Sequence, residues 1–222
     1  MSGSSYLRRA KAIFKKDPNG VLRKAKGVIH VGANIGQEAS LYHQHGLPVV
    51  WVEPNPEVFE LLRTNVKPYP DQIALLGLVT DVDDVEYPFH LANNGGESSS
   101  ILDMHLHQQV WPDVKYERTI LLRSRTLPSL LKENQVDIRK YDMLVMDTQG
   151  SELLILKGAA ALLKDIRFIK TEVPDFESYK DCCQIKDLEA FLVPLGFSEY
   201  SRHRFAKKRA TGNYFDIIYL RK

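Results

Sequence analysis

Short runs of apolar, largely β-branched residues alternate with segments of helical spacing along most of this chain. The runs with strand character lie at 27–31, 49–53, 73–79, 143–147 and 167–173. Between them, the periodicity predicts helices at 36–45, 56–66, 127–134, 152–163 and 185–195. Because parallel strands need a crossover connection, this alternation predicts an α/β fold with a doubly wound, mostly parallel sheet. Two final runs, 196–201 and 214–220, lack an intervening helix and predict a reversed strand at the sheet edge.

The alternation is interrupted between 80 and 126. Residues 85–91 and 117–123 predict two extra strands, 92–100 is a polar loop rich in glycine, serine and asparagine, and 101–116 has no regular period. The alternative is an ordinary surface loop, but loops of this length in compact domains are usually functional or disordered, so we expect the segment to bind the substrate. One domain is expected over 1–222, with a basic N-terminal helix and turn at 1–26 and a substrate-side insert at 92–118.

The two ends of the chain are basic, and the part between them is acidic. Residues 1–26 hold eight lysines and arginines against one acid, and residues 202–222 hold seven against one, although the formal net charge of the chain is only +2. A dedicated nucleic-acid-binding protein concentrates positive charge on its working face, so this distribution argues against a nucleic-acid partner. It predicts instead that the charged ends lie in solvent.

Neither the hydropathy nor the cysteines point to a membrane or to an oxidising compartment. No apolar run approaches the roughly 18 residues that a membrane-spanning helix needs, so we expect no transmembrane segment. The two cysteines, Cys182 and Cys183, are adjacent, which argues against a loop-closing disulfide, and the chain has no CxxC pair. We therefore expect a cytoplasmic protein.

The junction between the first strand and the first core helix predicts a ligand site. In a doubly wound sheet, ligands bind beyond the carboxyl ends of the strands. This junction runs from Val31 to Glu38 and contains Gly32 and Gly36, which let the backbone turn tightly and approach a ligand. The second strand ends about twenty residues later in Glu53, whose carboxylate can accept hydrogen bonds from both hydroxyls of a ribose. Loop and acid together predict a ligand that contains a nucleoside.

The glycine spacing distinguishes two such ligands. A dinucleotide loop follows G-x-G-x-x-G, because its pyrophosphate sits on the helix N-terminus and needs close approach of the backbone. Here Gly32, Asn34 and Gly36 stand at intervals of two, and Gln37 and Glu38 occupy the space that a pyrophosphate would need. An acid at that point repels phosphate but tolerates a sulfonium and an amino group. The loop therefore favours S-adenosylmethionine (SAM) over NAD.

Three segments resemble motifs of the FkbM family of SAM-dependent methyltransferases. They are VIHVGANIG at 28–36, WVEPN at 51–55 and DTQGSELLILKGA at 147–159, and the third is the most specific. The resemblance covers roughly 27–200. It implies the seven-stranded class I methyltransferase fold, with strand order 3-2-1-4-5-7-6 and strand 7 antiparallel, and O-methylation, often of sugars or polyketide-type natural products.

The resemblance also implies which residues contact the cofactor. From the first two motifs these are His30, Gly32, Asn34, Gly36, Glu53 and Pro54. Asp81 follows the third expected strand, where this fold usually places the group that reads adenine. The chain departs from the family pattern at two positions, because His30 stands where many members have aspartate and Gln149 stands where glutamate is commoner.

Methyl transfer from a sulfonium to a hydroxyl needs alignment, exclusion of water and a base for the attacking oxygen. The candidates for the catalytic group are Asp147 and Glu172, at the ends of two apolar strands, and His107 in the insert, with His105 as a further histidine there. Asp147 could equally orient the methionine amine or cap a helix. No set of histidine, aspartate and glutamate residues has convincing metal spacing, so no metal is expected.

The sequence therefore predicts a SAM-dependent O-methyltransferase that releases S-adenosylhomocysteine (SAH) and methylates a hydroxyl of a small-molecule or carbohydrate acceptor. Three alternatives stay open. An NAD-type oxidoreductase is disfavoured by the loop spacing, and an RNA methyltransferase rests on the basic ends alone. A non-catalytic SAM-binding module is the third, and the intact Gly32, Gly36, Glu53 and Asp147 argue against it.

Overall fold

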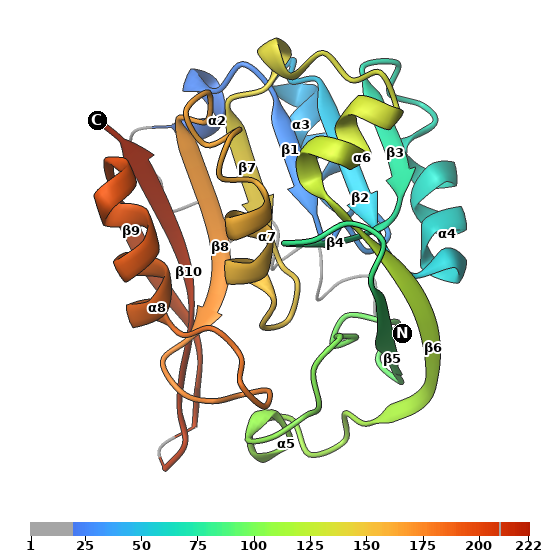
Figure 1. The fold of residues 1–222 in the computed structure, drawn as a ribbon, viewed down its shortest axis with the longest axis vertical. Coiled ribbons are helices and arrows are strands. Elements are labelled where there is room, and N and C mark those ends of the chain that lie inside the picture. The colour runs from blue at the N-terminus through green and yellow to red at the C-terminus, as the bar shows by residue number, and fades with distance from the viewer. Residues whose placement is uncertain (1–19, 209) are drawn as a thin grey trace.

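The computed structural model describes residues 20–208 and 210–222. Its main sheet has the strand order β3-β2-β1-β7-β8-β10-β9 (Figure 1). These strands are β1 (Val28–Val31), β2 (Val49–Glu53), β3 (Gln72–Leu76), β7 (Met143–Met146), β8 (Phe168–Pro174), β9 (Phe197–Lys208) and β10 (Gly212–Arg221). β10 runs antiparallel to both of its neighbours, β8 and β9, whereas β3, β2, β1, β7 and β8 pair in parallel with one another. The strand order implied by the family resemblance and its antiparallel strand are confirmed. The reversed strand itself is not at the edge, because β10 lies between β8 and β9 and β9 forms the edge.

The helices cover both faces of this sheet. They are α2 (Val21–Lys24), α3 (Ala39–Gln44), α4 (Pro56–Val66), α6 (Leu127–Glu133), α7 (Glu152–Gly158) and α8 (Ile185–Leu192). The short helix α5 (His107–Val110) lies apart from these layers, between β5 and β6 in the chain. Buried side chains of α6, α7 and α8 pack with Ile29, Val50 and Leu144 on one face, the front of Figure 1. Those of α2, α3 and α4 pack with Val28 and Trp51 on the other. The expected basic helix falls largely within 1–19 and so lies outside the described residues.

The helix starts follow from local chemistry. Asn55 accepts a hydrogen bond from the Glu57 N–H, and Pro56 occupies the first turn of α4, where a missing N–H carries no penalty. Two expected helices are shorter than the periodicity indicated. The one predicted at 36–45 begins only at Ala39, because Gly36 is held at φ +75° in the preceding turn. The one predicted at 152–163 ends at Gly158 and continues as turns.

A second sheet of three strands lies below the carboxyl ends of β1 and β2 in Figure 1. It has the order β4-β6-β5, with β4 (Leu78–Thr80), β5 (Glu86–Ala92) and β6 (Tyr116–Thr126). The prediction of a single strand at 73–79 was wrong. The chain leaves the main sheet at Gly77, so this segment forms the end of β3 and the start of β4. The Gly77 N–H still donates to the Glu53 carbonyl, after which β4 pairs in parallel with β6.

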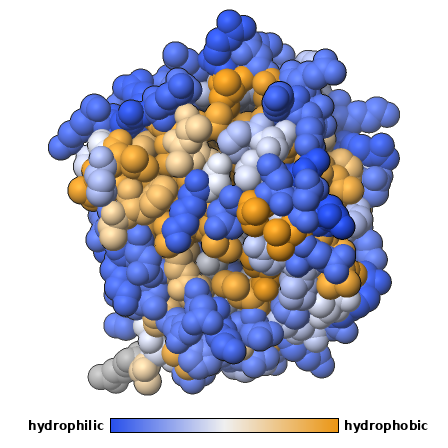
Figure 2. Space-filling view, in the orientation of Figure 1, coloured by the Kyte–Doolittle hydropathy of each residue, from blue (hydrophilic) through white to orange (hydrophobic). Residues whose placement is uncertain are grey.

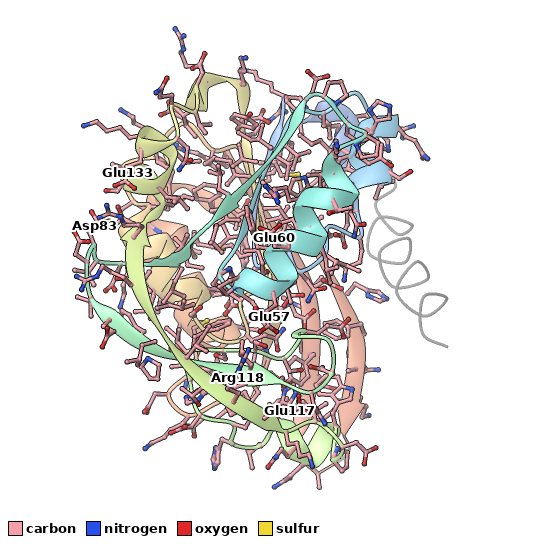
Figure 3. The ribbon with its side chains drawn as sticks, turned by 90° about the vertical axis from the view of Figure 1, so that its right-hand side faces the viewer. Glu57, Glu60, Asp83, Glu117, Arg118 and Glu133 are labelled. Atoms are coloured by element: carbon pink, nitrogen blue, oxygen red, sulfur yellow. The ribbon has the colours of Figure 1, made fainter. Side chains whose placement is uncertain are left out.

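An ion pair joins the second sheet to the main domain core. Figure 3 shows Arg118 of β6 close to Glu57 in the first turn of α4, and the guanidinium Nη2 lies 2.6 Å from the carboxylate Oε1. Both side chains are exposed, so this contact adds at most about 1 kcal/mol to stability. It lies beside the carboxyl edge of the main sheet, because Glu57 follows the last residue of β2 by four positions.

The face shown in Figure 2 is largely hydrophilic, with apolar areas between the charged groups. Across residues 20–208 and 210–222, we find no helix with the length and hydropathy needed to cross a membrane.

Candidate active site

A cavity of about 350 Å³ lies between the carboxyl ends of the central strands and the insert that carries β5, α5 and β6. The loops after β1, β2 and β7 form one wall, and residues of the insert form the opposite wall. Pockets of this size bind small organic ligands, and in doubly wound folds they lie at this edge of the sheet. The cavity therefore lies where the sequence predicts a ligand site.

The loop after β1 crosses the loop after β7 at close range. Gly32 has φ +78°, and a Cβ at this residue would lie 1.9 Å from the carbonyl oxygen of Asp147. The N–H groups of Gly32 and Ala33 both donate to the Val52 carbonyl. Only glycine fits such a crossing, so Gly32 brings the two ligand-binding loops together.

Glu53, at the end of β2, points into the cavity and is 6% exposed. Its Oε2 accepts the Asn34 N–H at 2.8 Å, and its Oε1 accepts the Asn55 N–H at 2.9 Å. Burial raises the pKa of Glu53 to about 7, and these two backbone hydrogen bonds oppose that rise. Each carboxylate oxygen has a further lone pair, so both can also accept a hydrogen bond from a ligand.

The loop after β7 presents Asp147 and Gln149 to the same cavity. The Gln149 Nε2 donates to Asp147 Oδ1 at 2.5 Å. Glu152, which is almost fully buried, accepts hydrogen bonds from the N–H groups of Thr148 and Gly150 and thereby shapes the loop. The structural role of Glu152 was not predicted, although its place in the third motif was a usable signal.

His107 begins α5 and lines the cavity from the insert side. Its Nδ1 lies 2.9 Å from the hydroxyl of Tyr214 on β10, and its ring packs against Trp111 and Tyr179. Burial lowers the pKa of His107 to about 4, so the imidazole is neutral at physiological pH. His105 is half-exposed beside Glu177 and does not line the cavity.

The far wall of the cavity carries charged groups from β8 and β10. Glu172 faces the cavity from the end of β8, as expected. Lys170 and Asp216, on neighbouring strands, form a buried ion pair with an Nζ–Oδ1 distance of 3.4 Å. Sequence reasoning missed this pair, although a lysine within the apolar run of β8 was a signal that this position meets a buried acid.

Burial, with a contribution from Lys170, lowers the pKa of His30 to about 3, so His30 is uncharged.

Most of the residues predicted from the sequence meet at this cavity. Those that line it are His30, Gly32, Asn34, Glu53, Pro54, His107, Asp147 and Glu172. Gly36 does not line it, because this residue packs towards α4, where a Cβ would lie 2.8 Å from a methyl carbon of Leu62. Asp81 does not line it either, because it follows β4 in the second sheet and is exposed. Gly77, Leu78 and Val79, which precede Asp81 in the chain, do line the cavity.

The serines of the insert support the loop itself. The Ser99 hydroxyl accepts the Ala92 N–H, and the Ser100 hydroxyl donates to the Gln149 carbonyl. Ser98 hydrogen-bonds Asn94. These hydroxyls therefore help to hold the cavity wall, and Ser98 and Ser99 also line the cavity. Among the described residues, no group of three or more histidine, cysteine, aspartate or glutamate side chains is arranged to hold a metal ion.

Residues 30–203 match the sequence model of a known protein family. This family is described as the methyltransferase FkbM domain. The 2-O-methyltransferase NoeI of Sinorhizobium fredii is 26% identical over 161 residues, which cover 69% of this chain and 65% of that protein. The chain thus spans about two thirds of the length of this curated relative.

Solved structures show the same fold at low sequence identity. TrmK of M. capricolum, solved with SAH, is 10% identical with a TM-score of 0.54, and the match covers 96% of this chain and 68% of that one. Magnesium protoporphyrin IX methyltransferase from Synechocystis PCC 6803, also with SAH, is 9% identical with a TM-score of 0.53, covering 99% and 84%. At these identities the likeness establishes the architecture alone.

Proposed function

The chain belongs to the FkbM-domain family of SAM-dependent methyltransferases, and from this premise we propose that it transfers a methyl group from SAM to a hydroxyl of a small molecule or glycan. The observation that carries the proposal is the buried Glu53 carboxylate facing a cavity that continues to Asp147. The family assignment sets aside the NAD-type oxidoreductase considered from the sequence. The RNA alternative gains no support from a cavity whose charged lining residues are mostly acids, with Lys170 as the one lysine among the described residues that line it.

The residues of the cavity fit a nucleoside with a sulfonium group. Glu53 can accept the ribose hydroxyls with the lone pairs that its two backbone hydrogen bonds leave over. The apolar residues Leu78 and Val79 suit the adenine, and Gly32 gives the methionine end access to the backbone. When bound, SAM supplies an electrophilic methyl group. The carboxylates of Glu38, Glu53 and Asp147 in the same wall favour its positive charge.

The acceptor is expected against the insert wall. Trp111, Phe89 and Ile101 supply apolar surface there, and Glu172 and Gln149 supply hydrogen-bonding groups. Apolar walls with a few convergent polar groups are typical of small-ligand sites. The curated relative is a 2-O-methyltransferase by name, which supports oxygen as the attacked atom, and its low identity leaves the acceptor of this chain to be found by experiment.

Three residues are proposed for the proton of the acceptor hydroxyl. Asp147 lies where the loops after β1 and β7 cross, Glu172 lies one strand further along the sheet, and His107 lies on the insert wall. A carboxylate that accepts a hydrogen bond from the hydroxyl orients it and takes its proton as the new bond forms. Asp147 is the leading candidate, since it is the least buried of the three.

The direct test of the proposed function is a screen of acceptor classes with methyl-labelled SAM. Free sugars, oligosaccharides, hydroxylated small molecules and RNA are incubated with the protein, and the labelled product is identified by mass spectrometry. Label on a hydroxyl oxygen of a sugar or small molecule, lost in the Asp147→Asn variant, supports the proposal. Transfer only to RNA, or to a nitrogen, contradicts it.

Replacing Glu53 by alanine is expected to weaken SAH binding by about 1–3 kcal/mol, or roughly 5- to 150-fold. The reason is that two ribose hydroxyls then lose their partner in a largely closed site. Calorimetry measures the change. Glu57→Ala, which removes an exposed carboxylate outside the cavity, is the matched control and should bind SAH as the wild type does. An unchanged affinity in Glu53→Ala would remove Glu53 from the ribose site.

SAH affinity is expected to rise about tenfold between pH 6 and pH 8. The pKa of Glu53 is about 7 in the free protein, and only the ionised carboxylate can accept both ribose hydrogen bonds. This raised pKa also means that the folded state holds more protons than the unfolded state between about pH 4.5 and 7, so this carboxyl lowers stability as the pH rises through that window. Calorimetry across the range should show the rise in the wild type and a flat profile in Glu53→Gln. A flat wild-type profile would contradict the assignment.

A further inference from the structure

The side chain of Gln149 bridges two parts of the cavity wall. Its Nε2 donates to Asp147 Oδ1 at 2.5 Å, and its Oε1 accepts the Tyr179 hydroxyl at 2.8 Å. Asp147 directly follows β7 at the centre of the main sheet, whereas Tyr179 lies in the loop after β8 and its ring packs against His107 of the insert. The amide therefore connects the loop after β7 with the acceptor-side wall.

The chemistry of Asp147 determines the orientation of this amide. An ionised carboxylate only accepts hydrogen bonds, so the NH₂ group of Gln149 must face Asp147 and the carbonyl must face the Tyr179 hydroxyl. The opposite orientation would place two acceptors 2.5 Å apart. A glutamate in place of Gln149 could form this bridge only by holding a proton.

The backbone around Gln149 is held in an unusual conformation. Gln149 has φ +55°, a region that residues with a side chain seldom adopt. Its carbonyl accepts the Ser100 hydroxyl at 2.9 Å, and the next N–H, of Gly150, donates to Glu152. Contacts from the insert on one side and from α7 on the other thus keep the Gln149 side chain directed at Asp147.

The hydrogen bond from Gln149 matters because other acidic groups surround Asp147. Glu53, Glu152 and Tyr179 each interact with the Asp147 charge, and each of them has its own ionisation disfavoured by it. Negative charge on Asp147 is disfavoured by Glu53 and Glu152 in return whenever they are ionised, because the interaction is mutual. A close N–H donor is the kind of group that restores the ionised form in such surroundings.

We propose that Gln149 is the positioning residue that keeps Asp147 ionised and directed into the cavity, and that Tyr179 fixes the Gln149 amide in the orientation this requires. The inference rests on the proposed function, because it assigns a catalytic task to Asp147. During transfer the acceptor oxygen forms a bond to the methyl carbon while the carbon–sulfur bond breaks and leaves its electron pair on sulfur. The hydroxyl proton passes to Asp147 and then to solvent.

Gln149→Glu is the informative variant, because it replaces the donor with a second carboxyl group of the same shape. Two carboxylates at this distance cannot both be ionised, so one proton should be shared between them. We expect the pKa of Asp147, followed by ¹³C NMR of its side chain in the free protein, to rise by at least one unit. The acid limb of the pH–rate profile should move upward by a similar amount.

Two further variants separate positioning from general damage. Gln149→Asn keeps an amide and tolerates positive φ, but it is too short to bridge both partners, so it should raise the Asp147 pKa without adding charge. Gln135→Glu is the matched control, since Gln135 also has φ +55° but is exposed and does not line the cavity. It should leave the Asp147 titration and the pH–rate profile as in the wild type.

The outcomes distinguish this inference from the proposed function. An Asp147 titration that is the same in wild type, Gln149→Glu and Gln149→Asn overturns the inference, even if the wild type methylates a hydroxyl. A raised Asp147 pKa together with an upward shift of the acid limb supports it. Absence of methyl transfer by the wild type to any acceptor overturns the proposed function, while the NMR titration still reports on the contact between Gln149 and Asp147.

Discussion

Asp147→Asn is expected to lower turnover by about 100-fold or more while the melting temperature changes little. Asparagine has nearly the same shape, so the Gln149 amide can still donate to its side-chain oxygen at the end of β7. What is lost is the negative charge that we propose orients the acceptor hydroxyl and takes its proton, and general base catalysis contributes about 10²–10⁴-fold. Initial rates at saturating SAM and a thermal melt measure the two effects.

The two other candidates provide the comparison for this variant. If Asp147→Asn retains wild-type turnover, Asp147 is not the base and the role moves to Glu172 or His107. Glu172→Gln and His107→Asn then become the decisive pair, because one alters the wall of the main sheet and the other alters the wall of the insert. SAH affinity should be close to that of the wild type in both, since neither residue belongs to the proposed ribose or adenine contacts.

Gly32→Ala is expected to lower the free energy of unfolding by about 3 kcal/mol and to abolish measurable SAH binding. A Cβ at Gly32 would lie 1.9 Å from the Asp147 carbonyl oxygen, and backbone rather than a movable side chain is in the way. The loops after β1 and β7 must then separate, which adds the loss of their packing to the strain of φ +78°. Denaturant unfolding and SAH calorimetry measure the two losses.

Gly46→Ala separates strain from collision. Gly46 also has a positive φ, +66°, but a Cβ there meets no atom within 4 Å. Its replacement should cost only about 1 kcal/mol, the usual penalty for a side chain in this region, and should leave SAH binding unchanged. Equal losses in the two variants would mean that the crossing of the two loops does not depend on Gly32.

The sheet could be predicted from the sequence because its strands are buried on both faces. Runs such as 49–52 and 143–146 are continuously apolar, and the apolar residues of the helices repeat at helical spacing, so local pattern and final fold agree. The differences lie where the chain turns. Gly36 packs towards α4 and does not line the cavity, and the strand expected at 73–79 divides at Gly77 because its second half pairs with β6.

The wall of the cavity around His107 and Gln149 could not be predicted because its contacts join residues far apart in the chain. His107 meets Tyr214 across 107 positions, and Gln149 meets Tyr179 across 30. The local periodicity of a sequence contains no information about contacts between residues so far apart. The cofactor side was more accessible, since Gly32 and Glu53 lie at the ends of neighbouring strands and their spacing has a direct physical meaning.

Calorimetric titration of the wild-type protein with SAH at pH 7.5, beside a parallel titration with NAD, tests the central claim most directly. The claim is that the cavity at the carboxyl ends of β1, β2 and β7 is built for a phosphate-free nucleoside held by Glu53. The account predicts saturable binding of one SAH per chain, weakened in Glu53→Ala, and no heat of binding with NAD. Binding of NAD with no binding of SAH would contradict it.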